Sequence, residues 1–362
     1  MEIPFLSIKT INEKHENSLY AAFKDFLNSG NYILGQSVKS FETNFAKYCE
    51  AKYCVGVANG LDALVMILNS FNFSKDTEII VPANTYFATI LAIKIAGLKP
   101  ILIEPNLKDY LINVENIKKA INKNTSAVLA VNLYGRMCDF RKITEICQKN
   151  NLKLIVDAAQ SHGAEFDNSK DCFGADAIAY SFYPTKNLGA LSDAGAVVTN
   201  NEAIASNVQR NRNYGSEQKY QFDSLGTNSR LSELQAAFLD IKLKQLDLEI
   251  GRRREIAGRY LSEIINNRLI LPPSDKTNQD AWHLFVVRTE NRDSLKRFLL
   301  NKQIGFDIHY PIPPHKQKAL AEFEELELPI TETIHQTILS LPLNSTLKEE
   351  EVDYIITSLN SY

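Results

Sequence analysis

Between about residues 50 and 200, short apolar runs alternate with longer amphipathic stretches. Apolar runs of this length are typical of strands buried on both faces of a parallel sheet. They predict seven strands: Cys54–Ala58, Glu78–Val81, Pro100–Glu104, Ala127–Asn132, Lys153–Asp157, Ala177–Phe182 and Gly195–Thr199. The stretches between them predict helices at Leu61–Ser70, Phe87–Ala96, Val114–Ile121 and Arg141–Lys149. Strands that alternate with helices in this way indicate an α/β fold with a mostly parallel sheet.

The pattern changes beyond residue 226. Apolar residues then recur at steps of three and four, which predicts one long amphipathic helix leading out of the large domain: Leu231, Leu234, Phe238 and Ile241. Farther on, the apolar run Leu284–Val287 and helical patterns around Ser294–Leu300 and Lys348–Leu359 predict a smaller α+β domain. We therefore expect a large domain at residues 1–245 and a small C-terminal domain at residues 246–362.

Charge and cysteine content narrow the class of protein. The chain has 40 Lys and Arg residues against 43 Asp and Glu residues, a formal charge of −3, with no long block of either sign. This balance disfavours a nucleic-acid or membrane-surface role that rests on bulk charge. Five cysteines without a CxxC pair, at positions 49, 54, 138, 147 and 172, are typical of reduced thiols in a cytoplasmic protein. No apolar run approaches ~18 residues, so we expect no membrane insertion.

One lysine and one aspartate carry the strongest chemical signal. Asp157 closes the apolar run that begins at Leu152, and Lys186 follows 29 residues later, just beyond another apolar run. Ligands of open α/β sheets bind outside the carboxyl ends of the strands, where both residues fall. Pyridoxal phosphate (PLP) binds covalently to a lysine amine and needs a carboxylate against its protonated ring nitrogen. At ~3 Å and an effective dielectric of ~20 such a pair is worth roughly 5 kcal/mol before desolvation.

Each residue of this pair also has a simpler explanation. A lysine in a loop is usually a solvated surface residue, and an aspartate after a strand is often a turn former or helix cap. Their common position, each just past a buried strand, favours the PLP interpretation. The sequence contains no His or Cys spacing that suits a metal site and no Ser/His/Asp arrangement.

Further residues lie where a cofactor would need them. Gly60 opens a helix after a strand, which suits phosphate binding but also simple helix capping. Tyr86 also follows a strand, and its ring would either stack on the cofactor or pack in the core. Gln160 and His162 come directly after Asp157, so we expect their side chains to reach the phenolic oxygen and the aspartate, respectively, although His162 is equally a structural histidine. Ser181 precedes the lysine loop and would donate to the phosphate.

Several motifs in the same order give the chain a family resemblance. It is similar to the DegT/DnrJ/EryC1/StrS sugar aminotransferases, PLP enzymes of fold type I that act on nucleotide-linked keto sugars. The resemblance covers essentially the whole chain and rests on Pro4–Leu6, Ile33–Val38, Phe41–Glu42, Asp157–Ala164, Ser181–Ala190, Asn228–Arg230 and His309–Pro311.

The resemblance implies a role for each matching residue. Lys186 would bind PLP covalently, Asp157 would face the pyridine nitrogen, and Gln160 would face the phenolic oxygen. Tyr86 would cover the ring. Three residues would hold the phosphate, the first two through backbone amides: Gly60, Leu61 and Ser181.

The resemblance also implies a homodimer whose two subunits share each active site. Asn228 would reach a phosphate across the interface. The candidates for contacts to the sugar nucleotide or to glutamate are Tyr183, Arg230, His309 and Tyr310; His309 would otherwise pack beside Pro311.

Within the family, Phe182–Gly195 and Gly226–Ala237 resemble enzymes that aminate C3 of dTDP-3-keto-6-deoxyhexoses. The expected activity is transfer of the amino group of L-glutamate, giving 2-oxoglutarate and, by overall likeness, the galacto-configured amino sugar. Ser192 stands where a glycine is common and Ser232 where an aspartate is common, and neither change removes a required group.

Three alternatives remain open. A related dehydratase carries a histidine in place of the lysine, so Lys186 argues against it. A C4 aminotransferase differs in which carbon of the product bears nitrogen. A catalytically idle PLP-binding regulatory or scaffold protein would form no 2-oxoglutarate.

Overall fold

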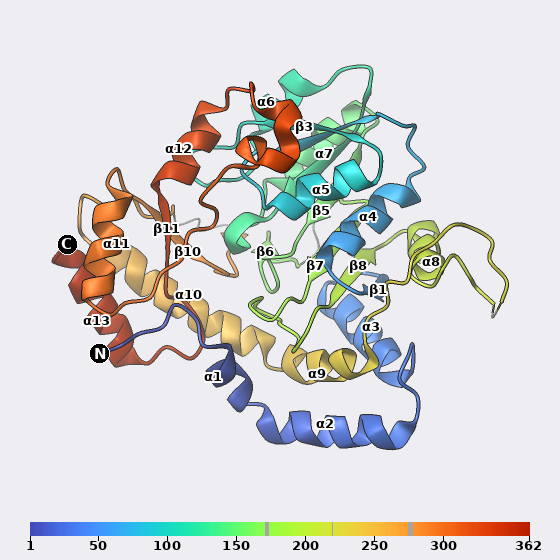
Figure 1. The fold of residues 1–362 in the computed structure, drawn as a ribbon, viewed down its shortest axis with the longest axis horizontal. Helices are drawn as coiled ribbons and strands as arrows, with labels where there is room; N and C mark the ends of the chain where they lie inside the picture. The colour runs from blue at the N-terminus through green and yellow to red at the C-terminus, as the bar shows by residue number, and fades with distance from the viewer. Residues whose placement is uncertain (171–173, 219, 274–277) are drawn as a thin grey trace.

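A seven-stranded sheet forms the centre of the chain in the computed structural model, which describes residues 1–170, 174–218, 220–273 and 278–362 (Figure 1). Its strand order is β1-β8-β7-β5-β4-β2-β3. Its strands are β1 (Tyr53–Val57), β2 (Glu78–Pro82), β3 (Lys99–Ile103), β4 (Thr125–Val131), β5 (Lys153–Asp157), β7 (Ala177–Ser181) and β8 (Gly195–Thr199). Only β8 pairs antiparallel with its neighbours in this sheet, which confirms the predicted mostly parallel α/β fold.

Four predicted helices connect these strands within two residues of the expected bounds. They are α4 (Gly60–Ser70), α5 (Phe87–Ile95), α6 (Val114–Ala120) and α7 (Phe140–Lys149). Among the described residues before position 226, four further helices were not predicted: α1 (Ile8–Glu13), α2 (Glu16–Ser29), α3 (Gln36–Tyr48) and α8 (Glu202–Asn211). In α3 the signal was present, because Val38, Phe41 and Phe45 recur on one helical face and are buried. Helix α2 packs on α9 at the lower edge of the view in Figure 1.

The prediction of a single long helix after residue 226 is wrong, because the chain forms two helices there. Helix α9 spans Glu233–Leu243 and α10 spans Leu246–Glu263, with a break at Lys244 and Gln245. Leu231 lies before α9, and its side chain packs directly over Gly56 of β1. Tertiary packing therefore decides which residues of the periodic apolar pattern are helical, and Leu231 packs against the sheet instead of joining the helix.

The C-terminal part contains a two-stranded sheet of β10 (Phe285–Arg288) and β11 (Ile338–Leu341) with α11 (Arg292–Asn301), α12 (Pro329–Thr337) and α13 (Glu349–Asn360). Short elements complete the chain: β6 (Glu165–Phe166) pairs with β9 (Asn278–Gln279), and 3-10 turns lie at Leu133–Gly135, Pro314–Lys316 and Lys318–Phe323.

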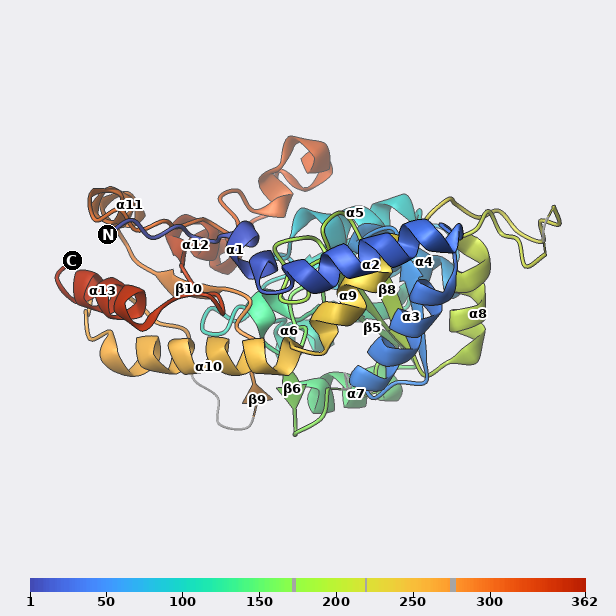
Figure 2. The ribbon, with the colours of Figure 1, turned by 90° about the horizontal axis from the view of Figure 1, so that it is seen from below.

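Two hydrophobic clusters meet along α10, the long helix across the lower part of Figure 2. Leu246 and Ile250 belong to the cluster around the large sheet, whereas Ile256 and Tyr260 belong to the C-terminal cluster. Ile3 also packs in the C-terminal cluster, so the N-terminus lies beside the last third of the chain. The division of the chain at residue 245 stays a prediction.

Four of the five cysteines lie among the described residues. Cys49, Cys54, Cys138 and Cys147 are buried, whereas Cys172 lies outside the described residues. Within the described ranges, none of the helices combines the length and apolar character needed to cross a bilayer.

Candidate active site

A cavity of about 520 Å³ lies at the carboxyl ends of the parallel strands. Residues from distant parts of the sequence line it because β5, β7 and the loops after β1 and β2 all end at this edge. It brings together ten of the predicted site residues: Gly60, Leu61, Tyr86, Asp157, Gln160, Ser181, Tyr183, Lys186, His309 and Tyr310.

Asp157 is a buried carboxylate at the end of β5. Its Oδ2 accepts a hydrogen bond from the Thr89 hydroxyl at 2.8 Å, and its Oδ1 accepts one from the Ala159 amide at 3.1 Å. Burial raises the pKa of Asp157, while these two donors and the nearby charge of Lys186 oppose that rise. A carboxylate held in this way gains by pairing with a cation that enters the cavity.

Lys186 lies in the loop after β7, where its amide donates to the Tyr183 carbonyl at 2.8 Å. Burial lowers the pKa of its amine to about 8, and the charge of Asp157 acts in the opposite direction. Near neutral pH a larger fraction of this amine is unprotonated than of an ordinary lysine, so it acts more readily as a nucleophile or base. Beside it, Asn187 donates to the Ala281 carbonyl at 3.0 Å, which fixes the loop against the chain before β10.

The start of α4 and Ser181 form a narrow cradle at one end of the cavity. Asn59 caps the helix by accepting from the Asp62 amide at 2.8 Å, so the expected capping function of this turn is present. A Cβ at Gly60 would lie only 2.7 Å from Cβ of Ser181. Gly60 therefore lets the helix start approach the serine, and the backbone amides of the first turn are positive partners for a phosphate.

Tyr86 and Tyr310 contribute two neighbouring rings to the lining of the cavity. Tyr86 immediately precedes α5 and is half exposed, and its ring centroid lies 5.0 Å from that of Tyr310. The Tyr310 hydroxyl accepts from Nε2 of Gln160 at 3.0 Å, and Oε1 of Gln160 accepts from the Tyr134 amide at 2.6 Å. Both ends of the Gln160 amide thus have protein partners.

His309 joins this edge from the C-terminal part of the chain. Its Nδ1 lies 2.9 Å from the Ser340 hydroxyl, and its Nε2 lies 3.6 Å from Oδ2 of Asp307. Burial lowers the pKa of His309, and the charge of Asp307 acts in the opposite direction. The ring is thus oriented by two side chains and does not simply pack beside Pro311.

His162 does not take the place expected for it. The hydrogen bonds described for the Asp157 carboxylate come from Thr89 and Ala159, and none comes from His162. The His162 ring lies fully buried, with its centroid 5.3 Å from that of Tyr180, and burial lowers its pKa to about 3. A neutral histidine packed under the site agrees with the structural alternative.

Asn228 and Arg230 lie outside this cavity. Asn228 closes a hairpin, described at residues 213–218 and 220–228, and the chain there projects beyond α8 in Figure 1. Asn228 pairs with Asn213 as an antiparallel bridge, and the Tyr214 amide donates to the Thr227 carbonyl at 2.8 Å. Arg230 donates to Oδ1 of Asn213 at 3.1 Å. Asn228 is exposed, so this chain alone does not bring it to the site.

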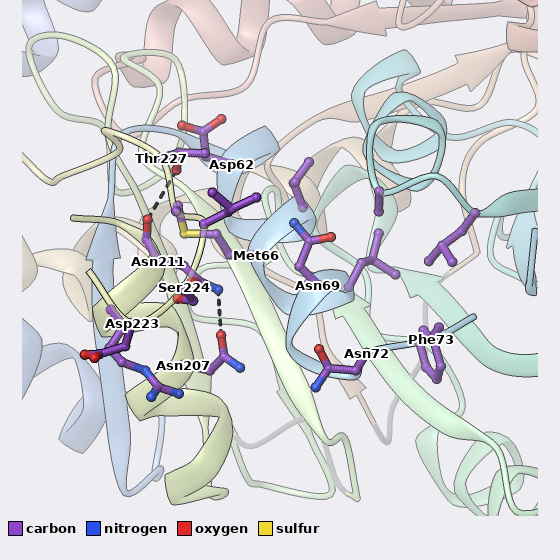
Figure 3. Close-up of a pocket in the computed structure, with 17 residues that line it drawn as sticks. Asp62, Met66, Asn69, Asn72, Phe73, Asn207, Asn211, Asp223, Ser224 and Thr227 are labelled. Atoms are coloured by element: carbon purple, nitrogen blue, oxygen red, sulfur yellow. Dashed lines mark hydrogen bonds between the residues drawn. The ribbon is translucent and has the colours of Figure 1, made fainter. Parts of the chain in front are cut away.

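A second cavity of about 550 Å³ lies between α4 and α8 at the base of this hairpin (Figure 3). Its polar lining includes four asparagines together with charged and hydroxyl side chains, and Asn211 donates to Asn207 at 2.6 Å within it. None of the predicted site residues lines it. The ten predicted residues that share a cavity therefore all line the first one.

Sequence reasoning missed several residues of the first cavity or its immediate support. Thr89 follows Tyr86 by three residues on the same helix face, and this spacing was a usable signal. Asn132 directly follows β4, where the carboxyl-end rule also applied. His283 gave no comparable signal, because only tertiary structure brings it beside the lysine loop.

Comparisons with known proteins agree with this geometry. The model of the DegT/DnrJ/EryC1/StrS aminotransferase family matches residues 13–360. The dTDP-3-amino-3,6-dideoxy-alpha-D-galactopyranose transaminase of Aneurinibacillus thermoaerophilus is 46% identical over 360 residues, which cover 99% of each chain.

Two solved structures are also similar. The crystal structure of DesV from S. venezuelae has a TM-score of 0.96 and 39% identity, covering 99% of this chain and 98% of that one. The structure of ntda from Bacillus subtilis with bound cofactor PMP has a TM-score of 0.93 and 29% identity, covering 99% of this chain and 84% of that one. The chain therefore belongs to the DegT/DnrJ/EryC1/StrS aminotransferase family.

Proposed function

We propose that this protein transfers the amino group of L-glutamate to C3 of a dTDP-3-keto-6-deoxyhexose, with PLP as cofactor. The observation that carries the proposal is the presence of Lys186 and Asp157 in one cavity of a chain from a PLP-dependent aminotransferase family. Lys186 also argues against the dehydratase alternative, which requires a histidine at this position.

The residues of the cavity fit PLP in charge and shape. The buried Asp157 carboxylate would face the ring nitrogen, and Tyr86 would cover the ring. The narrow cradle at Gly60, together with Leu61 and Ser181, would hold the phosphate. When bound, PLP supplies the electron sink that makes amino transfer possible.

The protein's own groups then perform binding and proton transfer. The Lys186 amine, with a pKa of about 8, would move the proton from Cα of glutamate to the cofactor carbon in the first half of the reaction. In the second half it would move a proton from the cofactor carbon to C3 of the sugar. Asp157 would keep the cofactor cationic, and Thr89 would keep Asp157 ionised and oriented. Tyr183, His309 and Tyr310 line the same cavity and would contact the sugar nucleotide.

The test of this function is product analysis. The purified protein is incubated with PLP, L-glutamate and dTDP-3-keto-6-deoxyhexose of either C4 configuration, and the product is identified by NMR. We expect 2-oxoglutarate and a C3 amino sugar, with preference for the galacto epimer, which the name of the A. thermoaerophilus relative supports. Nitrogen at C4 of a product formed from a 4-keto sugar would favour the C4 alternative, and absence of 2-oxoglutarate with every sugar would favour a catalytically idle protein.

We also propose a homodimer in which the projecting hairpin reaches the partner's site. Its apolar side chains are exposed in the single chain, with Tyr220 80% and Leu225 101% accessible. Exposed apolar side chains of this size call for a covering surface. Asn228, near the base of the hairpin, would then approach the partner's phosphate.

Light scattering tests the dimer directly. We expect a dimer for the wild type and a larger monomer fraction for Leu225→Asp. Leu248→Asp is the matched control, because Leu248 is equally apolar and 72% exposed on α10. A monomeric wild type, or equal effects of both substitutions, would contradict the proposed role of the hairpin.

A further inference from the structure

The segment from Asp307 to Tyr310 leaves the C-terminal sheet and enters the edge of the active-site cavity. Asp307 is still paired with β11, because its amide donates to the Ser340 carbonyl at 3.2 Å and its carbonyl accepts from the Ser340 amide at 2.8 Å. Two residues later the chain has left that pairing, and His309 and Tyr310 line the cavity. Other contacts must therefore fix these two residues.

The backbone carbonyls of both residues accept hydrogen bonds from buried side chains. The Tyr134 hydroxyl donates to the His309 carbonyl, and Nδ1 of His335 lies 2.7 Å from the Tyr310 carbonyl. A carbonyl only accepts, so Nδ1 of His335 carries the proton. Burial lowers the pKa of His335 to about 4, which keeps this ring neutral and the tautomer fixed near neutral pH.

Tyr134 also controls the neighbouring Gln160. Its amide donates to Oε1 of Gln160, whose Nε2 in turn donates to the Tyr310 hydroxyl. The result is a closed set of contacts in which Tyr134 fixes the main chain at His309 and, through Gln160, the phenol of Tyr310. Tyr134 is itself held rigidly, because it is buried and packs edge to face against Tyr110 with ring centroids 5.6 Å apart.

Through its position in the chain, Tyr134 connects the large sheet to the C-terminal part. Tyr134 belongs to the 3-10 turn after β4 of the large sheet, whereas His309 and Tyr310 belong to the C-terminal part of the chain. Its backbone has a φ of 61°, which few residues other than glycine adopt, so the turn is shaped by its contacts and not by local preference. The hydroxyl thus joins the sheet that carries Asp157 to the segment that carries His309.

We infer that Tyr134 is a positioning residue for sugar binding. It acts through His309 and Tyr310 by holding their backbone at a fixed distance from Asp157 and Lys186. This inference rests on the proposed function, in which those two residues contact the sugar nucleotide. Because glutamate is a much smaller substrate, its reaction depends on Lys186 and Asp157 and less on this segment.

Tyr134→Phe tests the inference, because it removes the hydroxyl and keeps the ring and the amide that donates to Gln160. We expect KM for the keto sugar to rise about tenfold, while the rate of the half-reaction with glutamate, followed by cofactor absorbance, stays within about twofold. Hydrogen exchange of the backbone amides within residues 307–311, of which Pro311 has none, should also become faster. Ser340→Ala, which removes the partner of the His309 ring, is a second and smaller perturbation with the same expected direction.

Tyr260→Phe is the matched control. Tyr260 is also a buried tyrosine that donates to a backbone carbonyl, at Pro342, but it lies in the C-terminal hydrophobic cluster. Its substitution should lower thermal stability to a similar extent and leave sugar KM and exchange at residues 307–311 unchanged.

The outcomes separate the two proposals. If the wild type is active and the KM for the sugar is unchanged in both Tyr134→Phe and Ser340→Ala, the positioning role is overturned. Equal loss of both half-reactions in Tyr134→Phe overturns it too. A wild type that forms no aminated sugar overturns the proposed function, and hydrogen exchange at residues 307–311 then still decides whether Tyr134 holds the segment. If hydrogen exchange is unchanged in a folded Tyr134→Phe protein, the claim that Tyr134 holds this segment is overturned as well.

Discussion

Substitution of Thr89 by valine should weaken PLP binding without disturbing the fold. Valine has nearly the shape of threonine and a similar helix propensity, so α5 and its packing should persist. The substitution removes the hydroxyl that donates to Oδ2 of Asp157 at 2.8 Å. Thr89 is fully buried, so water has no free path to replace that donor.

The magnitude follows from the charge on the acceptor. A hydrogen bond to a charged group is worth about 1.5–3 kcal/mol, and one pKa unit corresponds to about 1.36 kcal/mol. The pKa of Asp157, already raised by burial, should therefore rise further when this donor is lost. Since the cationic ring of PLP pairs with the ionised carboxylate, the Kd for PLP should increase by about tenfold or more.

The assay is a titration of the cofactor-free protein with PLP, followed by absorbance. Thr85→Val is the matched control, because the Thr85 hydroxyl contacts Thr89 at 2.8 Å and not the carboxylate itself. Its effect on Kd should be several times smaller. A Thr89→Val protein that is folded and binds PLP as tightly as the wild type would refute the idea that this hydroxyl sustains the charge of Asp157.

Three further predictions concern other parts of the site and its support. Lys186→Met should abolish the yellow absorbance of the PLP-loaded protein. The pKa of the Lys186 amine is about 8 in the folded protein and 10.5 when unfolded, so the unfolded chain binds more protons between these pH values. The cofactor-free wild type should therefore gain stability relative to this variant as the pH rises from 8 to 10.5, measured by thermal unfolding. Gly60→Ala should weaken PLP binding because its Cβ would crowd Ser181, whereas Gly258→Ala in α10, where a Cβ meets nothing within 4 Å, should not. Glu104→Gln should destabilise the protein by about 1–3 kcal/mol in thermal unfolding, because the carboxylate accepts three hydrogen bonds at the start of α12; an unchanged melting temperature would contradict this.

Much of the large sheet followed from the sequence alone. Strands β5 and β8 have the predicted bounds, and the other strands of the sheet differ from prediction by no more than two residues at either end. These strands are buried on both faces, so each is a nearly continuous apolar run that stands out locally. The same logic located Asp157 and Lys186, because the end of a buried strand is visible in the sequence and ligands bind at that edge.

The helical periphery was less predictable. Helix α9 begins only at Glu233, because Leu231 packs over Gly56 instead of joining the helix. A periodic pattern does not reveal which partner an apolar side chain will meet. The positions of His162 and Thr89 show the same limit, because proximity in sequence favoured the histidine as the partner of Asp157 and the fold brought the threonine there instead.

The local pattern of apolar runs and the chemistry of single residues thus determined the sheet, the strand ends, and the pair formed by Asp157 and Lys186. Tertiary structure alone decided that Tyr134, His309 and the lysine loop meet at one cavity, since these residues are separated by many positions in the chain. The physical reason is that strand and helix periodicities arise from contacts between near neighbours. The partners of a buried polar group are instead set by how whole elements pack, which the order of residues does not display.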